Sequence, residues 1–236
     1  MSVDYNNIAK SFSQSRKNMK WEEIEYFLEQ LNSDNYNILD VWCGNGRFYG
    51  ALLTSPLAPL LTGEGNIEYL WIDLSQWLLD EAQGIYPWVA FQQWNMLELQ
   101  SLYSPSSYKE RGLGGEVDLI FFIASFHHLE NIEDRLSVLQ QAYDILQPGW
   151  TIYMTNWALD SEINTEKYSR SIVPDSQNKF WSHDYSIKFW EYPRYYHWFS
   201  VTELEYLFTQ AWFEIIENRE FDTHKNFISI IKKPLH

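Results

Sequence analysis

The stretch Asn37-Ile38-Leu39-Asp40-Val41-Trp42-Cys43-Gly44-Asn45-Gly46-Arg47 decides the fold of this chain. Residues 38–41 predict a short buried strand, and Gly44 and Gly46 mark a tight loop after it. A helix is expected to open near Gly46. A strand, a glycine-rich turn and a helix place backbone N–H groups and the positive end of a helix at the carboxyl edge of a sheet. That edge is where open α/β sheets bind their ligands.

The remaining elements alternate as in a doubly wound α/β sheet with right-handed crossovers. Residues 117–124 are almost entirely apolar, with Asp118 near the start, which is typical of a central parallel strand buried on both faces. Hydrophobic periodicity predicts further strands at 67–73, 88–92, 151–157, 212–219 and 226–232, and helices within 5–31, after Ser75, at 131–146 and at 201–210. Residues 98–116 are rich in Ser, Gly and Pro, and we expect a mobile loop there.

The composition is that of an acidic globular protein, with a formal net charge of −15 and a pI near 4.7. This charge disfavours a free-standing tRNA or DNA binder. Residues 1–20 are locally basic, which suits either an anion-binding arm or a solvated helix end. No membrane-spanning run and no signal-peptide pattern is evident, and the single Cys43 fits a reducing compartment. We therefore expect a cytoplasmic protein without membrane contact.

Tryptophan is unusually abundant, with 12 Trp against 10 Gly in 236 residues. Several tryptophans stand where backbone geometry asks for glycine: Trp42 in the loop above, Trp71 at a strand end, Trp150 after Pro148-Gly149, and Trp212 before a strand. Glycine tolerates positive φ and lets other groups come close, and an indole does neither. We hypothesise that UGA codons, which some bacterial lineages read as glycine, were translated here as tryptophan. The alternative is a tryptophan-rich core.

Polar residues follow other predicted strands at the same edge of the sheet. Asp73 ends the second strand, where an acid in dinucleotide-type sites hydrogen-bonds ribose hydroxyls. Helix capping is the alternative, although Ser75 already supplies a cap. Asn95-Met96 follows the third strand, and residues 124–128 follow the central one. The pair His127-His128 lacks a Cys or carboxylate at ligand spacing, so we expect no metal site.

These residues resemble the class I S-adenosylmethionine-dependent methyltransferases. Asp40, Gly44 and Gly46 match the (Asp/Glu)-x-Gly-x-Gly-x-Gly motif of that class, with Trp42 at the first glycine position. Within the class, the chain resembles the eukaryotic enzymes that methylate carboxymethyluridine at the tRNA wobble position. The blocks Tyr5–Arg16, Phe126-His127-His128 and Arg194-Tyr195-Tyr196-His197 carry that narrower resemblance, which spans nearly the whole chain.

The resemblance implies a Rossmann-like seven-stranded sheet with an antiparallel last strand, and S-adenosyl-L-methionine as cofactor. We expect a single domain with N-terminal helices (1–36), a cofactor-binding core (37–157), a substrate-covering insertion (158–200) and a C-terminal helix and strands (201–236). The implied cofactor-binding residues are Asp40, Trp42, Gly44, Gly46, Asp73, Leu74, Asn95, Met96, Ala124 and His127. As it stands, Trp42 puts an indole where the methionine part of the cofactor should lie.

A carboxylate substrate fits this chemistry, because a carboxylate is ionised at pH 7 and needs no general base. The enzyme has to hold oxygen, methyl carbon and sulfur collinear and dry. An anionic substrate calls for cationic anchors. We expect Arg194, His197 and Tyr195 as catalytic residues, with Arg16 and Tyr196 binding the substrate. Paired tyrosines and a lone histidine are also common core residues.

We therefore expect a methyltransferase that acts on a carboxylate in wobble-uridine tRNA. A methyltransferase for the carboxylate or another oxygen of a small molecule is the first alternative, which the charge favours. A non-catalytic scaffold is the second, if Trp42 is genuine. The eukaryotic relatives work with a small zinc-binding subunit, so the resemblance also implies a small activating partner.

Overall fold

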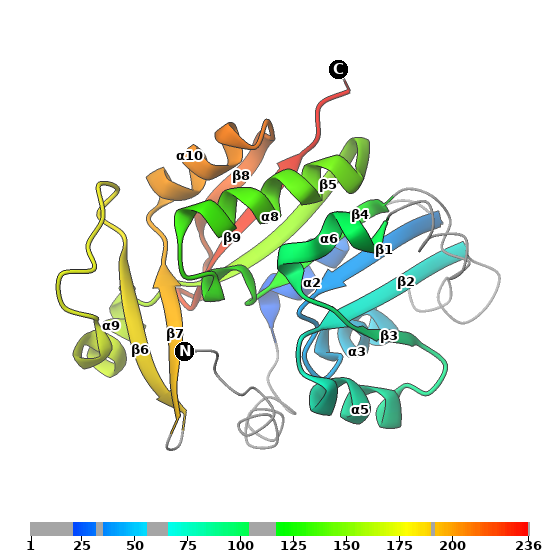
Figure 1. The fold of residues 1–236 in the computed structure, drawn as a ribbon, viewed down its shortest axis with the longest axis horizontal. Helices are drawn as coiled ribbons and strands as arrows, with labels where there is room; N and C mark the ends of the chain where they lie inside the picture. Colours follow the sequence, from blue (N-terminus) through cyan, green and yellow to red (C-terminus); the bar gives the residue numbers. More distant parts are fainter. Residues whose placement is uncertain (1–20, 32–34, 56–65, 104–116, 190–191, 236) are drawn as a thin grey trace.

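The computed structural model describes residues 21–31, 35–55, 66–103, 117–189 and 192–235. Its centre is a seven-stranded sheet in the order β3-β2-β1-β4-β5-β9-β8 (Figure 1). Strand β9 runs antiparallel to β5 and β8, whereas β1 to β5 pair in parallel. The strands are β1 (Asn35–Val41), β2 (Asn66–Asp73), β3 (Ala90–Gln93), β4 (Val117–Ile123), β5 (Leu146–Trp157), β8 (Glu214–Glu220) and β9 (Asn226–Lys232). The doubly wound sheet with an antiparallel last strand is confirmed.

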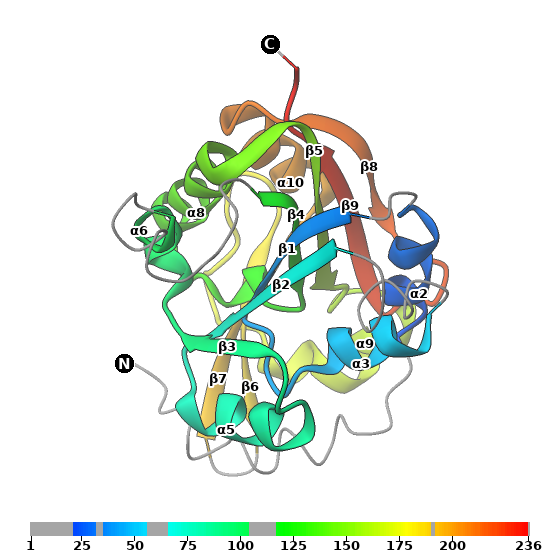
Figure 2. The same ribbon diagram turned by 90° about the vertical axis from the view of Figure 1, so that its right-hand side faces the viewer.

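Helices cover both faces of the sheet because successive residues of the central strands point to opposite sides. All seven residues of β4 are buried. Ile120 and Phe122 belong to one core cluster, and Leu119 and Phe121 belong to the other. The first cluster contains residues of α6 (Leu99–Leu102), α8 (Ile132–Ile145) and α10 (Val201–Gln210), and the second those of α2 (Glu22–Glu29), α3 (Arg47–Thr54) and α5 (Gln76–Ile85). Figure 2 shows α6 and α8 on one side of the strands, with α2 and α3 on the other.

The helices after the strands begin at polar caps, as their sequences indicate. Ser75 accepts a hydrogen bond from the Leu78 amide at the start of α5, and Ser200 accepts one from Glu203 at the start of α10. Such caps satisfy amides that have no partner within the helix. The first turn of α5 thus lies directly after β2, at the sheet edge where the expected ligand site lies.

The described residues of the segment 158–200 lie beside this edge. It contains α9 (Glu162–Tyr168), the 3-10 turn η3 (Ser169–Ser171) and an antiparallel hairpin of β6 (His183–Phe189) with β7 (Tyr192–Trp198). The hairpin forms a two-stranded sheet of its own and lies at one end of the molecule (Figure 1). Strand β7 contacts η2 (Phe126–His128), the 3-10 turn that follows β4. The hairpin therefore reaches the carboxyl end of the central strand.

Three local expectations need correction or fall outside the described residues. Residues 96–102 are helical (η1, Met96–Glu98, then α6), where we expected the loop 98–116 to begin, because Leu99 and Leu102 are fully buried in the core. The rest of that loop, 104–116, and the predicted helix within 5–20 lie outside the described residues. Strand β5 begins at Leu146 and so includes the Pro148-Gly149 turn. In the described ranges, no helix has the length and apolar character needed to span a membrane.

Candidate functional site

The loop after β1 is held at the carboxyl edge of the sheet by backbone hydrogen bonds. The Cys43 amide donates to the Ile72 carbonyl at 3.1 Å, and the Gly46 amide donates to the Cys43 carbonyl at 3.2 Å. Residues 42, 44 and 46 all have positive φ, at 59°, 61° and 81°. This alternation turns the chain from the strand into α3, with Gly46 as its N-cap. A side chain at Gly46 is excluded, because its Cβ would lie 2.2 Å from the ring of Trp71.

Asp73 joins this loop to the end of β2. Its two carboxylate oxygens accept hydrogen bonds from the amides of Gly44 at 2.9 Å and Ser75 at 2.8 Å. Burial raises the pKa of Asp73, while these amides and the nearby Arg194 and Arg47 oppose the rise. The carboxylate is therefore fixed in place at the edge of the site, where it can still accept a ligand hydroxyl, because each oxygen has two lone pairs.

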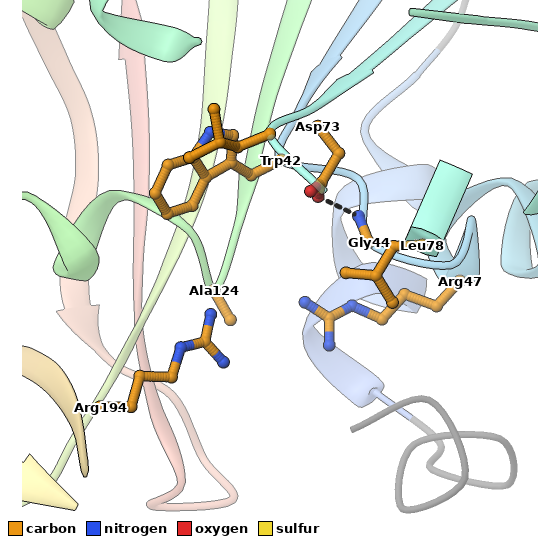
Figure 3. A pocket seen from close by; sticks show the side chains of 8 residues that line it. Trp42, Gly44, Arg47, Asp73, Leu78, Ala124 and Arg194 are labelled. Carbon is orange, nitrogen blue, oxygen red and sulfur yellow. Dashed lines mark hydrogen bonds between the residues drawn. The ribbon is translucent and has the colours of Figure 1, made fainter. Parts of the chain in front are cut away.

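A pocket opens where the sheet order reverses between β1 and β4, the point at which doubly wound folds bind ligands. Figure 3 shows the guanidinium groups of Arg47, from α3, and Arg194, from β7, on opposite sides of it and pointing toward one another. Its volume is about 30 Å³, room for roughly two water molecules. The lining residues are Trp42, Gly44, Arg47, Asp73, Leu74, Leu78, Ala124 and Arg194.

The indole of Trp42 forms one wall of this pocket. It stacks on the ring of His128, with centroids 5.9 Å apart and an interplanar angle of 28°. The Nδ1 atom of His128 lies 2.9 Å from the Tyr195 carbonyl, to which it can donate. Burial, followed by the charge of Arg194, lowers the pKa of His128 well below its ordinary value. The wall is thus a neutral aromatic stack beside a guanidinium group.

A second, smaller pocket adjoins the first and shares Arg47, Ala124 and Arg194 with it. Aromatic rings form most of the remaining wall. Tyr196 stacks on Trp157 with centroids 4.8 Å apart, and its ring meets that of His128 edge-on at 4.6 Å. The guanidinium carbon of Arg194 lies 5.4 Å from the centre of the Tyr196 ring. The lining residues are Arg47, Ala124, His127, His128, Trp157, Arg194 and Tyr196.

Strand alternation decides which residues of the Arg194–His197 block reach the pockets. Arg194 and Tyr196 lie on one face of β7 and line them, whereas Tyr195 and His197 lie on the other face. The two ring nitrogens of His197 lie 2.6 Å from an Asp184 oxygen and 2.9 Å from a Glu203 oxygen. The hydroxyl of Tyr195 donates to Asp184 at 2.7 Å. The structure therefore places the side chains of His197 and Tyr195 outside both pocket linings, in contacts that anchor the hairpin.

Asp40 also lies outside both pockets, although we expected it to bind the cofactor. Its side chain is buried beneath the loop and accepts a hydrogen bond from the Tyr69 hydroxyl at 3.2 Å. Burial, opposed by the nearby Arg47 and this hydrogen bond, raises the pKa of Asp40 to about 7. The residue supports the strand end from which the loop departs.

The structure brings most of the expected site residues together. Eight of them line the two pockets: Trp42, Gly44, Asp73, Leu74, Ala124, His127, Arg194 and Tyr196. Gly46 shapes the loop, Asn95 caps η1 through the Leu97 amide, and the Met96 side chain is buried in the core. Arg16 lies outside the described residues. Sequence reasoning missed Arg47, Leu78 and Trp157 as lining residues, although Arg47 directly follows the last motif glycine.

The chain is similar in sequence to a known protein family and to several characterised proteins. The family model for a methyltransferase domain matches residues 13–218. A mouse tRNA (carboxymethyluridine(34)-5-O)-methyltransferase, ALKBH8, is 28% identical over 163 residues, which are 69% of this chain and 20% of that protein. An Arabidopsis thaliana tRNA (carboxymethyluridine(34)-5-O)-methyltransferase is 28% identical over 167 residues, 67% of this chain and 32% of that protein. The chain thus spans a fifth to a third of the curated relatives that it matches.

One solved structure shares the fold over almost its full length. It is a complex between the Haloferax volcanii Trm112 methyltransferase activator and a methyltransferase. The match has a TM-score of 0.66 at 13% sequence identity and covers 99% of both chains. At that identity the match speaks for the fold alone.

Proposed function

The chain belongs to the methyltransferase domain family, and on this premise we propose that it is an S-adenosylmethionine-dependent methyltransferase that methylates the carboxylate of a modified wobble uridine in tRNA. The observation that carries the proposal is the pair of guanidinium groups, Arg47 and Arg194, facing one another across the pocket (Figure 3). Among the described residues that line this pocket, two cations and one carboxylate, Asp73, favour an anionic ligand within a chain of net charge −15.

The residues around Asp73 fit the cofactor, but Trp42 does not. Asp73 lies at the strand end where such folds bind ribose hydroxyls, and the amide-rich loop lies beside it. The indole of Trp42 forms one wall of this pocket, whose volume of about 30 Å³ is far too small for a methionine moiety. The cofactor supplies the methyl group in this class. The roles below therefore concern only what the chain does with the substrate.

Arg194 and Arg47 have the geometry of a carboxylate clamp. Planar guanidinium groups bind carboxylates with directed, charge-assisted hydrogen bonds. Arg47 is itself fixed, since its Nη2 donates to the Ile123 carbonyl at 2.9 Å. Arg194 is buried and lies over the Tyr196 ring. The rings of Tyr196 and Trp157 offer a flat wall on which a pyrimidine can stack.

The proposal is tested by Arg194→Ala, made in the Trp42→Gly background. We expect methyl transfer to tRNA carrying wobble carboxymethyluridine to fall at least ~100-fold, because the nucleophile loses its orienting cation. Binding of S-adenosylmethionine, measured calorimetrically, should remain. The methyl-transfer rate of Arg194→Lys should lie between that of Arg194→Ala and that of the protein with Arg194, because a lysine gives a point charge without the planar fork.

The matched control is Arg219→Ala, since Arg219 lies on β8, away from both pockets, and forms ion pairs with Glu217 and Asp222. This control should keep its turnover. Unchanged turnover in Arg194→Ala would refute the assignment of Arg194 to the substrate.

A small-molecule carboxylate is the second candidate substrate, and the net charge of −15 favours it. The Arg47–Arg194 clamp can bind the carboxylate of either substrate. Binding measurements on the whole protein are therefore needed to distinguish tRNA from a small carboxylate. A small activating subunit is also proposed, on the precedent of the archaeal Trm112 complex with the same fold. Co-expression with such a subunit should raise the yield or the turnover of the enzyme, and an unchanged enzyme would argue against this partner.

A further inference from the structure

Three tryptophans of this chain occupy left-handed backbone. Among the described residues, six non-glycine residues have positive φ, and Trp42, Trp181 and Trp212 are three of them, at 59°, 68° and 67°. Left-handed backbone brings Cβ close to the following carbonyl oxygen, and bulky residues are genuine outliers there. The left-handed backbone of these three tryptophans therefore needs a common explanation.

Trp42 stands at a motif position that requires this conformation. The loop alternates left-handed residues at 42, 44 and 46, and the last two are glycine. These are the three glycine positions of the (Asp/Glu)-x-Gly-x-Gly-x-Gly pattern that begins at Asp40. At residue 42 the backbone therefore has the conformation that the motif expects of glycine, although the side chain is that of tryptophan.

Trp212 stands at the end of α10 in the position where helices most often place glycine. The Phe213 amide donates to the Phe208 carbonyl at 3.0 Å, and the Trp212 amide donates to the Thr209 carbonyl at 3.1 Å. These two bonds define a Schellman motif, whose left-handed residue after the cap is usually glycine. The side chain of Trp212 is 71% exposed, so core packing does not hold the indole there.

Trp181 stands in the turn that leads into β6. The Trp181 amide donates to the Asn178 carbonyl at 3.0 Å, and the Asn178 amide donates to the Ser182 carbonyl at 2.8 Å. A tight turn followed by a left-handed residue that closes the loop is a recurrent design with glycine at that residue. Trp181 is 73% exposed.

Two tryptophans that the sequence also singled out do not share this geometry. Trp150 has ordinary φ, because the preceding Gly149 takes the left-handed conformation at 84°. Trp71 also has ordinary φ, and its ring is fully buried among the rings of Tyr49, Tyr69 and other aromatic residues. Backbone φ therefore separates Trp71 and Trp150 from the tryptophans at glycine-like positions, and it adds Trp181 to the latter.

We propose that positions 42, 181 and 212 are glycine positions of the functional protein, and that Trp42 is what closes the cofactor pocket. Translation of UGA codons as tryptophan, where the source organism reads them as glycine, accounts for all three. Only the statement about the pocket rests on the proposed function. Replacing the side chain of Trp42 by hydrogen would open one wall of the pocket that Asp73, Arg47 and Arg194 also line.

The backbone part is tested by thermal unfolding of Trp181→Gly and Trp212→Gly. Each should raise Tm by roughly 2–4 °C, because glycine removes left-handed strain of about 1 kcal/mol from a chain of this size. Trp88→Gly is the matched control, since Trp88 is 66% exposed and has ordinary φ. It should lower Tm or leave it unchanged. A fall in Tm for Trp181→Gly and Trp212→Gly, as for the control, would overturn the proposal.

The pocket part is tested by calorimetric titration of S-adenosylmethionine into the chain with Trp42 and into Trp42→Gly. Binding at least ~10-fold tighter to Trp42→Gly supports the proposal, and equal binding overturns the claim that Trp42 closes the pocket. Absent binding in both, with raised Tm at 181 and 212, upholds the glycine positions and refutes the proposed function. Peptides from the native source that carry tryptophan at these positions would overturn the glycine assignment.

Discussion

Asp40, a buried carboxyl group beneath the loop that follows β1, makes the stability of the protein depend on pH. It is 1% exposed, and burial raises its pKa from 3.8 to about 7. The folded state therefore holds this proton over a pH range in which the unfolded chain has lost it. Stability from Asp40 is full below pH 4 and declines as the pH rises toward 7, because the folded state binds more protons there.

Asp40→Asn should remove this decline, since an amide carries no charge to bury and can still accept from the Tyr69 hydroxyl. We expect Tm at pH 8 to equal or exceed that of the parent, with an upper bound of about 4 kcal/mol on the gain in stability. The slope between pH 4 and 7 becomes shallower, although Asp160, whose pKa is raised to about 6 by burial, keeps part of it.

The control for this pH series is Asp80→Asn, because Asp80 is exposed on α5. It should follow the parent at every pH. An unchanged slope in Asp40→Asn, measured by thermal unfolding at steps of one pH unit, would contradict the assignment of the buried charge.

At the scale of elements, a buried ionic network fastens the β6–β7 hairpin to the helices. Glu203 of α10 is fully buried and accepts hydrogen bonds from Arg135 of α8 at 3.1 Å and from Asn178 at 3.0 Å, and it pairs with His197 of β7. The other ring nitrogen of His197 lies 2.6 Å from an Asp184 oxygen, so this ring bridges the two carboxyl groups. The network holds β7 in the register that turns Arg194 toward the pocket.

Glu203→Gln should destabilise the protein by about 3–5 kcal/mol, because it leaves Arg135 buried without its counter-charge. We expect earlier proteolysis of the hairpin and weaker substrate binding, both from the loosened β7. The control is Glu205→Gln, on the exposed face of the same helix, which should change stability by less than about 0.5 kcal/mol. Equal effects of the two variants, measured by denaturant unfolding, would contradict the role of the network.

The same network predicts acid sensitivity of the opposite sign to that of Asp40. Burial alone would raise the pKa of Glu203, but hydrogen bonds and charge from His197 lower it to about 2. The stabilisation is present above pH 4.5 and is lost as the pH falls toward 2, because the unfolded state then binds the proton first. Loss of hairpin protection from hydrogen exchange between pH 4.5 and 2, ahead of global unfolding, is the expected observation. A hairpin as stable at pH 3 as at pH 6 would be inconsistent with it.

At the scale of the whole molecule, charge separates the two candidate substrates. A net charge of −15 repels tRNA, so tRNA binding has to rely on local cations such as the Arg47–Arg194 pair. Binding that involves several phosphates should weaken at least tenfold between about 50 and 200 mM salt. A small carboxylate that contacts only the clamp should weaken by less than about threefold. Fluorescence anisotropy with labelled tRNA, and calorimetry with a small carboxylate, decide between the two.

The fold and the place of the site followed from the sequence, because hydrophobic periodicity and glycine spacing are local signals. The apolar run of β4, the loop from Asp40 to Gly46 and the acid at Asp73 sufficed to predict a doubly wound sheet with a ligand edge. Arg194 and Tyr196 were also expected to bind ligand. Tyr195 and His197 were expected beside them, and the structure turns both to the other face of β7.

Only the tertiary structure decided what these residues do together. Arg47 of α3 and Arg194 of β7 line the same pocket. These two segments are far apart in the sequence, and no local sequence pattern relates them. The burial of Asp40 and the ionic contacts of His197 likewise depend on the helices and strands packed around them. Backbone φ at Trp42, Trp181 and Trp212 is set by the hydrogen bonds of whole turns. The composition suggested that some tryptophans stand at glycine positions. Only the backbone φ angles identified which ones, because steric strain is a property of the folded chain.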